Sequence, residues 1–347
     1  MMLLIYTYYS ILLLDTGRFY NPLQADLRSA DPATSILSYI LYGILLLIAV
    51  YLVVMFQTRS LFKTRKLLKE KEKILEQIEK QKSDLELKDK NLTDSLIYAQ
   101  RIQKALLPSE EFFRKYFSES FIFFKPKDIV SGDFYWIEEM DDKIFIVGAD
   151  CTGHGVPGAL MSMLGLEIIK KTIIEDKIEI PSEILAVLNK GLERTFSREK
   201  NIGTIIRDGM DIGLCLIDRK NRKAHYAGAF FPLYLIRDNA LIEIKGDKLI
   251  IGMNPAGISY TNHEIELRDH DILYIFSDGY ADQFGGTENK KFMYRRFRYL
   301  LNTIHRFPVN DQKSILDDNI KTWMSGNPQI DDIMVIGFKP LSGGVSK

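Results

Sequence analysis

The chain has little cysteine, with two in 347 residues, so it is not a disulfide-stapled scaffold. It also has no excess of charge of either sign, because 46 Lys and Arg balance 46 Asp and Glu. This balance argues against nucleic acid as a partner, which a general basic field would attract, and leaves only a local basic patch open. Its 11 prolines and 23 glycines exclude a collagen-like or low-complexity chain. The length allows one large domain with added segments, or two domains.

Residues 35–56 lack any charged side chain, and Ile, Leu, Val and Tyr dominate them. A run of this length can cross a bilayer as a helix, in which every backbone polar group is satisfied internally. The basic residues that follow, beginning at Arg59 and Lys63, place that end in the cytoplasm by the positive-inside rule. A buried core helix is the alternative, but core helices rarely run this long without a charge. We therefore predict a transmembrane helix over residues 35–57, in the cell membrane, with the following part of the chain in the cytoplasm.

The segment before this helix, residues 1–34, begins with the short apolar run Met1–Leu14 and continues as a polar stretch. The run lacks the basic start of a signal peptide, and no cleavage site of small residues clearly follows it. We predict a short apolar N-terminal segment and a small extracytoplasmic loop, and leave open whether residues 1–14 themselves span the membrane.

Residues 60–107 contain neither glycine nor proline, and a heptad frame fits them. One seam position holds Lys71, Ile78, Leu85, Leu92, Ala99 and Leu106, and the other holds Leu68, Leu75, Lys82, Asp89, Leu96 and Gln103. The frame is mostly apolar but broken by polar residues, which is typical of a marginal coiled coil that can dimerise and change register. The alternative is a solvated single helix held by local Glu and Lys pairs. We predict a coiled-coil signalling helix that forms a homodimer.

From residue 109 onward the composition is that of a globular domain, and Pro108 ends the preceding helix. Strands are predicted at 121–124, 134–137, 143–148, 210–218, 223–228, 232–236, 271–276 and 333–338, and helices at 156–175, 181–196, 289–304 and 311–324. In residues 211–218 apolar side chains occupy both faces, as in a strand buried on two sides. Strands come in clusters and helices in pairs, so we predict an α+β domain with antiparallel sheets over residues 109–340.

Acidic side chains mark the ends of several predicted strands, namely Asp133, Asp150, Asp278 and the pair Asp331 and Asp332. A strand end is rigid yet reaches solvent, and the glycines beside the first three let metal, water and phosphate approach the backbone. Carboxylates that converge repel each other unless a cation lies between them. Oxygen ligands suit Mg²⁺ or Mn²⁺, and two such ions can activate water and clamp a phosphate. Taken singly, each Asp-Gly motif is equally compatible with a plain turn.

Taken together and in this order, these acidic residues and the short sequence strings around them resemble the metal-dependent serine/threonine protein phosphatases (the PPM family), in the bacterial branch typified by the stage II sporulation protein E phosphatase. The resemblance covers about residues 95–340. It rests on the strings at 99–108 (AQRIQKALLP), 130–135 (VSGDFY), 150–160 (DCTGHGVPGAL), 208–211 (DGMD), 277–279 (SDG) and 331–333 (DDI). It implies an α-β-β-α sandwich of two antiparallel sheets flanked by helices, with two metal ions between the sheets at one edge.

The resemblance also implies roles for five residues. Asp150 corresponds to the carboxylate that bridges both ions, and the backbone carbonyl of Cys151 to a further ligand. Asp278 and Asp331 correspond to the ligands that complete the first metal site, and Asp133 to the residue that holds metal-bound waters. A water between the ions would attack phosphorus directly, so neither a Cys nor a Ser nucleophile is needed.

Four other residues have less certain counterparts in the family. Asp332 falls where eukaryotic members often carry Asn, which places it directly behind the ligands. Lys127 lies near the position of an arginine that grips phosphate in eukaryotic members, and is either a phosphate contact or a solvated lysine. His154 is not spaced as the acid histidine of those members, so we assign it a structural role. Asp211 is either an approach to a third metal ion or, as we favour, a strand-edge carboxylate.

We therefore predict a membrane-tethered protein phosphatase that uses two Mn²⁺ or Mg²⁺ ions to hydrolyse phosphoserine or phosphothreonine on a cytoplasmic regulatory protein. In related bacterial phosphatases the substrate is often a small regulator that controls a sigma factor by partner switching, so the resemblance implies a partner of that kind. One alternative is a non-catalytic signalling or binding module of the same fold, against which the full set of carboxylates counts. Another is a small-molecule phosphohydrolase, which a deep enclosed pocket would favour over a wide, shallow site.

Overall fold

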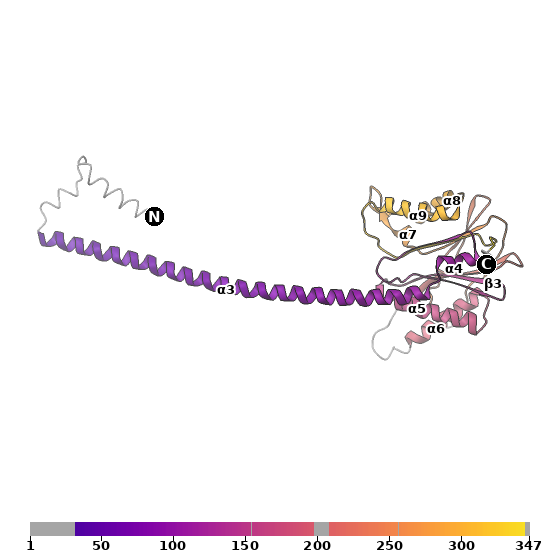
Figure 1. Cartoon of the computed structure of the whole chain (residues 1–347), viewed down its shortest axis with the longest axis horizontal. Helices are drawn as coiled ribbons and strands as arrows, with labels where there is room; N and C mark the ends of the chain where they lie inside the picture. The colour runs from indigo at the N-terminus through magenta and orange to yellow at the C-terminus, as the bar shows by residue number, and fades with distance from the viewer. Residues whose placement is uncertain (1–31, 154, 198–207, 256, 344–347) are drawn as a thin grey trace. The chain divides into compact units, whose positions relative to one another are not determined.

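The computed structural model describes residues 32–153, 155–197, 208–255 and 257–343 (Figure 1). The predictions made for residues 1–31 and for His154 lie outside the described residues. The chain divides into two units, residues 1–88 and 89–347, which are described here one at a time.

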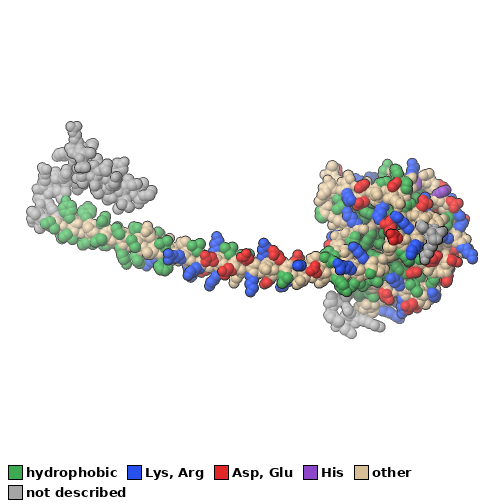
Figure 2. All heavy atoms as spheres, viewed as in Figure 1, with side chains coloured by type: hydrophobic (Ala, Val, Ile, Leu, Met, Phe, Trp, Pro, Cys, Tyr) green, Lys and Arg blue, Asp and Glu red, His purple; other side chains and the backbone are tan. Residues whose placement is uncertain are grey.

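The described part of the first unit is a single helix, α3 (Pro32–Leu106), which continues into the second unit. In the described residues, α3 alone is long and apolar enough to cross a membrane, judged by length and composition. The mean hydropathy of its most apolar window is 2.6, and none of that window is buried. Figure 2 shows hydrophobic side chains around the first part of α3, followed by charged ones. The described chain therefore does not bury this segment as a core helix.

The predicted coiled-coil seam lies on the exposed surface of α3. Leu75, Ile78 and Leu85 are each more than half exposed in the single chain. Lys82 and Glu86 form an exposed i,i+4 ion pair of 3.9 Å, a contact that would stabilise a solvated single helix. The coiled coil and the single helix thus both remain predictions.

The second unit contains two five-stranded sheets, in which every pair of neighbouring strands is antiparallel. The first sheet has the order β1-β12-β9-β6-β7, with β1 (Ser120–Lys125), β12 (Ile333–Phe338), β9 (Ile272–Phe276), β6 (Leu233–Arg237) and β7 (Ala240–Ile244). The second has the order β2-β3-β4-β5-β8, with β2 (Phe134–Met140), β3 (Lys143–Cys151), β4 (Met210–Asp218), β5 (Lys223–Ala229) and β8 (His263–Glu266).

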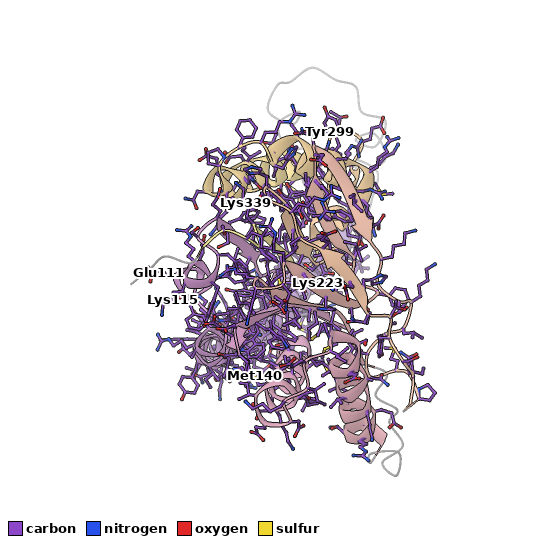
Figure 3. The ribbon with its side chains drawn as sticks, turned by 90° about the vertical axis from the view of Figure 1, so that its right-hand side faces the viewer. Glu111, Lys115, Met140, Lys223, Tyr299 and Lys339 are labelled. Atoms are coloured by element: carbon purple, nitrogen blue, oxygen red, sulfur yellow. The ribbon has the colours of Figure 1, made fainter. Side chains whose placement is uncertain are left out.

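Helices cover both outer faces of the sheet pair (Figures 1 and 3). On one side lie α5 (Gly155–Lys170), its π-helical continuation η1 (Lys171–Glu175) and α6 (Pro181–Ser197), and on the other α8 (Tyr294–Ile304) and α9 (Val309–Met324). In Figure 3, Tyr299 marks the α8 side and Met140 the opposite side. Two short helices, α4 (Glu110–Tyr116) and α7 (Gly279–Asp282), complete the unit. The predicted sandwich of two antiparallel sheets flanked by helices is confirmed.

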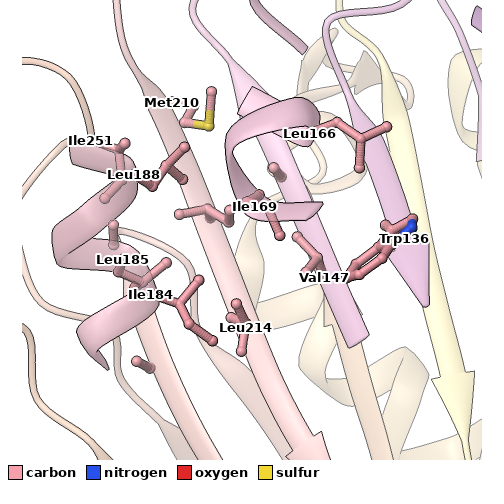
Figure 4. Close-up of a cluster of buried hydrophobic side chains, with 14 of the residues drawn as sticks. Trp136, Val147, Leu166, Ile169, Ile184, Leu185, Leu188, Met210, Leu214 and Ile251 are labelled. Atoms are coloured by element: carbon pink, nitrogen blue, oxygen red, sulfur yellow. The ribbon is translucent and has the colours of Figure 1, made fainter. Parts of the chain in front are cut away.

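Three apolar layers hold the sandwich together, and strand alternation assigns side chains to them. In β3, Phe145 and Val147 face α5 and α6, whereas Ile144 and Ile146 face the other sheet. Figure 4 shows Val147 among side chains from α5 and α6, including Ile169. A third layer joins the first sheet to α8 and α9. The prediction that residues 211–218 form a strand with two buried faces is confirmed.

The predicted helix at 289–304 is wrong in its first turn. A hairpin of β10 (Phe284–Gly285) and β11 (Lys290–Lys291) precedes α8, which begins only at Tyr294. Asn289 and Met293 have φ values of 47° and 74°, which are incompatible with a right-handed helix. The strands β7 and β8 were not predicted, because both are edge strands whose side chains are mostly exposed or half-buried.

Candidate functional site

The acidic residues singled out in the sequence come together through strand pairing. Asp133 directly precedes β2, and Asp150 lies near the end of β3, where Phe134 pairs with Ala149. Asp211 on β4 is the direct cross-strand partner of Asp150. In the other sheet, Asp278 follows β9 and Asp331 precedes β12, and these two strands are also paired. Each sheet therefore presents carboxylates at the ends of neighbouring strands.

The two sheets approach each other closely beside Asp150. A Cβ atom at Gly148 would lie 2.5 Å from Cγ2 of Ile275 on β9, and 3.1 Å from Cε of Met334 on β12. Only glycine fits this contact without displacing its neighbours. The close approach places the carboxylates of one sheet near those of the other.

Asp332 fixes the loop that carries Asp133. Asp332 is 3% exposed, and its carboxylate accepts hydrogen bonds from the backbone N–H groups of Lys127 and Gly132, both at 2.7 Å, and from that of Asp133 at 3.4 Å. A carboxylate that accepts several backbone N–H groups is a strong, geometrically defined anchor. Asp332 therefore links the start of β12 to the turn before β2.

The loop before β2 also packs against the turn that follows Asp150. A Cβ atom at Gly132 would lie 2.7 Å from the carbonyl oxygen of Gly153 and 3.3 Å from that of Cys151. The carbonyl groups of this turn thus lie at the site itself. The Cys151 side chain is 3% exposed, and burial raises the pKa of its thiol well above the ordinary value, so the thiol stays protonated.

The carboxylates raise one another's pKa values. Burial raises the pKa of Asp133 well above its ordinary value, against a hydrogen bond from Ser277, and the charges of Asp332, Asp331 and Asp278 raise it further. Burial likewise raises the pKa of Asp150, and Asp133 and Asp278 are the next causes. Such mutual repulsion marks a site that needs positive charge.

The two carboxylates at the rim of this group behave in the same way. Burial raises the pKa of Asp278 to about 6, with the charge of Asp331 as the next cause. Burial also raises the pKa of Asp211 to about 7, and Asp278 adds to it. Electrostatically, Asp211 thus belongs to the same cluster.

The cluster fits a divalent cation by its donor set. Oδ2 of Asp133 and Oδ1 of Asp278 are buried without a hydrogen-bond partner, which is costly for a carboxylate oxygen. The side chains of Asp278 and Asp150 also lie close enough for their contact to lower the pKa of Asp278, and two carboxyl groups so close need a shared proton or a nearby cation. Among the described residues, no three His, Cys, Asp or Glu side chains already form a finished ligand set. The unpaired oxygens still fit a cation, because rotation of these side chains about their strand-held backbone can complete its coordination.

The remaining predicted residue, Lys127, is half-buried on the loop before β2. Its backbone N–H is held by Asp332, and its ammonium group forms no ion pair within the described residues. The Lys127 ammonium group is therefore available to bind an anion.

Three residues at or beside the carboxylate cluster were not predicted there from the sequence. Ser277 and Tyr294 were not singled out, and Gln103 was predicted on the coiled-coil seam. Ser277 accepts the backbone N–H of Met334 at 3.0 Å and hydrogen-bonds to Asp133. Burial raises the pKa of Tyr294, and the charges of Asp278 and other acidic groups of the site contribute, so its phenol lies near the cluster. The only sequence signal for Ser277 was its place in the SDG string.

Gln103 was predicted on the coiled-coil seam but is 6% exposed within the second unit. Its amide donates to the carbonyl of Ser131 at 2.6 Å and to Oγ of Ser162 at 3.2 Å, and accepts the N–H of Ser131 at 3.0 Å. The end of α3 is therefore bonded to the loop that precedes Asp133. One sign of this contact was present in the sequence, namely that Gln103 is a polar residue at an otherwise mostly apolar seam position.

Comparisons with known proteins agree with this arrangement. The sequence model of the stage II sporulation protein E (SpoIIE) family matches residues 140–340. The SiaA-PP2C domain of Pseudomonas aeruginosa is 34% identical in sequence, with a TM-score of 0.66. That comparison covers 72% of this chain and 98% of the other.

More distant relatives share parts of the chain. The phosphoserine phosphatase RsbU of Bacillus subtilis (strain 168) is 26% identical over 163 residues, which are 45% of this chain and 44% of RsbU. This chain thus spans less than half the length of that curated relative. The structure of the RsbU and RsbW domains of Rv1364c from Mycobacterium tuberculosis is similar in fold, with 15% identity and a TM-score of 0.50. It covers 66% of this chain and 61% of the other.

Proposed function

Because the chain belongs to the stage II sporulation protein E family of PPM-type protein serine/threonine phosphatases, we propose that it hydrolyses phosphoserine or phosphothreonine on a cytoplasmic regulatory protein with two Mn²⁺ or Mg²⁺ ions as cofactors. The observation that carries this proposal is the convergence of carboxylates from both sheets, two of whose buried oxygens have no hydrogen-bond partner. Ions bound there would supply activated water and would neutralise the charge that develops on the phosphoryl group.

We propose Asp150, Asp278, Asp331 and the carbonyl of Cys151 as ligands of the ions, with Asp133 beside them. The mutual rise of the pKa values of Asp133, Asp150 and Asp278 supports this assignment, because a cation would relieve their repulsion. None of these residues acts as a nucleophile in the proposal.

Two further residues support this group in the proposal. Asp332 holds the loop that presents Asp133, through its hydrogen bonds to the backbone of Lys127 and Gly132. The ammonium group of Lys127 is proposed to contact the phosphate of the substrate, because it lies on this loop and is unpaired within the described chain.

The substrate is proposed to be a phosphorylated regulator of a partner-switching system. The similarity to a phosphoserine phosphatase, RsbU, supports this choice of reaction. The proposal is made for this class of substrate.

The first test is the metal dependence of the reaction. We expect the full chain in detergent to hydrolyse a generic phosphate ester with Mn²⁺ or Mg²⁺ and to lose that activity when a chelator is added. After the chelator is removed, the activity restored by Mn²⁺ can be compared with that restored by Mg²⁺, and the larger value identifies the preferred ion. Undiminished turnover in excess chelator would contradict the two-metal proposal. Absence of turnover from folded, metal-loaded protein would favour a binding module instead.

We further propose a domain organisation in which residues 35–57 cross the membrane, residues 60–107 form a coiled-coil signalling helix that dimerises through the part before Gln103, and residues 109–340 form the phosphatase domain. The continuity of α3 from Pro32 to Leu106 supports it, since no break separates the apolar part from the bonded end at Gln103. A change in register of the coiled coil would then be transmitted to the loop that carries Asp133.

Insertions in α3 test this coupling. We expect insertion of three or four residues after Lys82 to change activity of the full chain about fivefold or more, because it shifts the phase of the seam. Insertion of seven residues at the same place is the control, because it keeps the phase and should leave activity close to that of the wild type. Equal activity across the whole series would exclude the coupling, and analytical ultracentrifugation of each variant would check the homodimer.

A further inference from the structure

A groove of about 330 Å³ lies on the surface of the second unit, beside the edge strand β7. Its lining includes Phe230, Tyr234, Lys245, Lys248, Tyr294 and Arg298. These residues come from the ends of β5 and β6, from the chain after β7, and from the start of α8. The groove thus combines aromatic side chains with cationic ones.

Tyr294 joins the groove to the carboxylate cluster. The residue before it, Met293, donates its backbone N–H to the carbonyl of Ala281 at 2.7 Å, and Ala281 lies in α7, which starts directly after Asp278. The start of α8 is therefore held against the segment that carries a proposed metal ligand. The acidic charges that contribute to the raised pKa of Tyr294, after burial, include that of Asp150. Tyr294 thus lines the groove and adjoins the segment that carries Asp278.

The groove carries an excess of positive charge. The exposed Lys245 and Lys248 form no ion pair within the described residues. Arg298 pairs with Glu243 at 3.0 Å, so these two charges compensate each other. Asp247, between the lysines in sequence, accepts hydrogen bonds from the backbone N–H and hydroxyl of Thr261 at 2.6 and 2.9 Å, and forms no ion pair with either lysine within the described residues. The ammonium groups of Lys245 and Lys248 are therefore available for an acidic ligand, although Asp247 keeps its own charge.

Phe230 presents an aromatic ring at the same surface. It is 46% exposed and has a φ of 51°, a left-handed conformation that is unfavourable for a residue with a Cβ atom. Two backbone hydrogen bonds hold it there, from its N–H to the carbonyl of Asp247 at 2.7 Å and from the N–H of Asp247 to the carbonyl of Gly228 at 2.8 Å. An exposed aromatic ring in a strained, well-anchored backbone is typical of a recognition site.

We propose that this groove binds the acidic polypeptide segment beside the phosphorylated residue of the substrate protein. Phe230 contacts an apolar side chain of that segment, and Lys245 and Lys248 pair with its acidic residues. The phosphorylated residue itself extends past Tyr294 to the carboxylate cluster. This inference rests on the proposed phosphatase function and adds the determinant of substrate choice.

The test compares two phosphoserine peptides that differ only in their flanking residues, one with Asp and one with Asn at the same positions. The full chain in detergent should hydrolyse the acidic peptide with a kcat/KM about tenfold higher, with most of the difference in KM. In the Lys245→Gln/Lys248→Gln double variant, the ratio of the two kcat/KM values should fall to near one. In Phe230→Gly, which suits the positive φ, kcat/KM should fall for both peptides, mainly through KM.

Lys220→Gln, which removes an exposed lysine outside the groove lining, is the matched control and should keep the ratio of the wild type. A wild type without preference for the acidic peptide would overturn the inference, as would a double variant that keeps the preference. Absence of turnover by the wild type on both peptides and on a generic phosphate ester would instead contradict the proposed function. The two failures are therefore distinguishable.

Discussion

We expect the Asp150→Asn substitution to lower kcat/KM of the full chain by about a thousandfold or more, measured with Mn²⁺ on a phosphate ester. Asp150 lies near the end of β3, opposite Asp211 on β4, and its carboxyl group lies close to that of Asp278. Asparagine keeps the shape of the side chain but lacks the charge and one of the two acceptor oxygens that a divalent ion requires. The affinity for Mn²⁺, measured by isothermal titration calorimetry, should fall together with the rate.

The matched control for this substitution is Asp142→Asn, in the exposed turn before the other end of β3. Asp142 has a φ of 64°, which asparagine tolerates, so activity should stay within about twofold of the wild type. Metal-free Asp150→Asn should unfold at no lower temperature than the wild type, because the substitution removes one of several mutually repelling charges. Full activity and undiminished Mn²⁺ affinity in Asp150→Asn would contradict its assignment as a ligand.

Sequence patterns predicted the strands that are buried on both faces better than those at the sheet edges. In β4, apolar side chains on both faces enter two separate cores, so the pattern was long and unambiguous. The residues of β7 and β8 are mostly exposed or half-buried, and each strand pairs with a single neighbour. Their strand conformation depends on pairing with β6 and β5 more than on their own residues, and local sequence does not encode that pairing.

The carboxylates of the site were found because each belongs to a short string with its own chemical character. Tyr294 belongs to no such string. It lies near the cluster only because Met293 is hydrogen-bonded to Ala281, a contact between residues twelve apart (293 − 281) that follows from the hairpin between them. The same hairpin displaced the predicted start of the helix, so a single tertiary feature accounts for both misses.

Gln103 shows a different limit of sequence reasoning. A heptad frame assigns a buried side, but it does not say what covers that side. The amide of Gln103 makes three hydrogen bonds to Ser131 and Ser162, as a polar group in a protein interior must. Residue 103 would be buried by a coiled-coil partner or by the phosphatase unit, and the sequence pattern is the same in both cases. Only the folded structure shows that the phosphatase unit covers it.

We expect Gly279→Ala to have the second large effect, because it forces apart two segments that carry proposed ligands. A Cβ atom at residue 279 would lie 1.9 Å from the carbonyl oxygen of Asp332 and 2.9 Å from its carbonyl carbon. Backbone atoms cannot rotate away as a flexible side chain can, so either α7 or the start of β12 must move. We expect the free energy of unfolding to fall by about 2 to 3 kcal/mol, measured by urea unfolding of the full chain with tryptophan fluorescence.

The same displacement should affect catalysis, because Asp278 directly precedes Gly279 and Asp331 directly precedes Asp332. A shift of about 1 Å at a reacting centre can cost about a hundredfold in rate, so we expect a loss of that size or more in kcat/KM. Mn²⁺ should also raise the unfolding temperature of the variant less than that of the wild type, because ligands held apart bind the ion more weakly.

Gly343→Ala controls for the addition of a methyl group, since a Cβ atom there meets no atom within 4 Å. Its free energy of unfolding should change by less than about 0.5 kcal/mol, and its activity should not change. If Gly279→Ala were stable and active, α7 and β12 would have room to separate without cost. The close backbone contact between them would then be incidental, and the positions of Asp278 and Asp331 would have to be fixed by β9 and β12 alone.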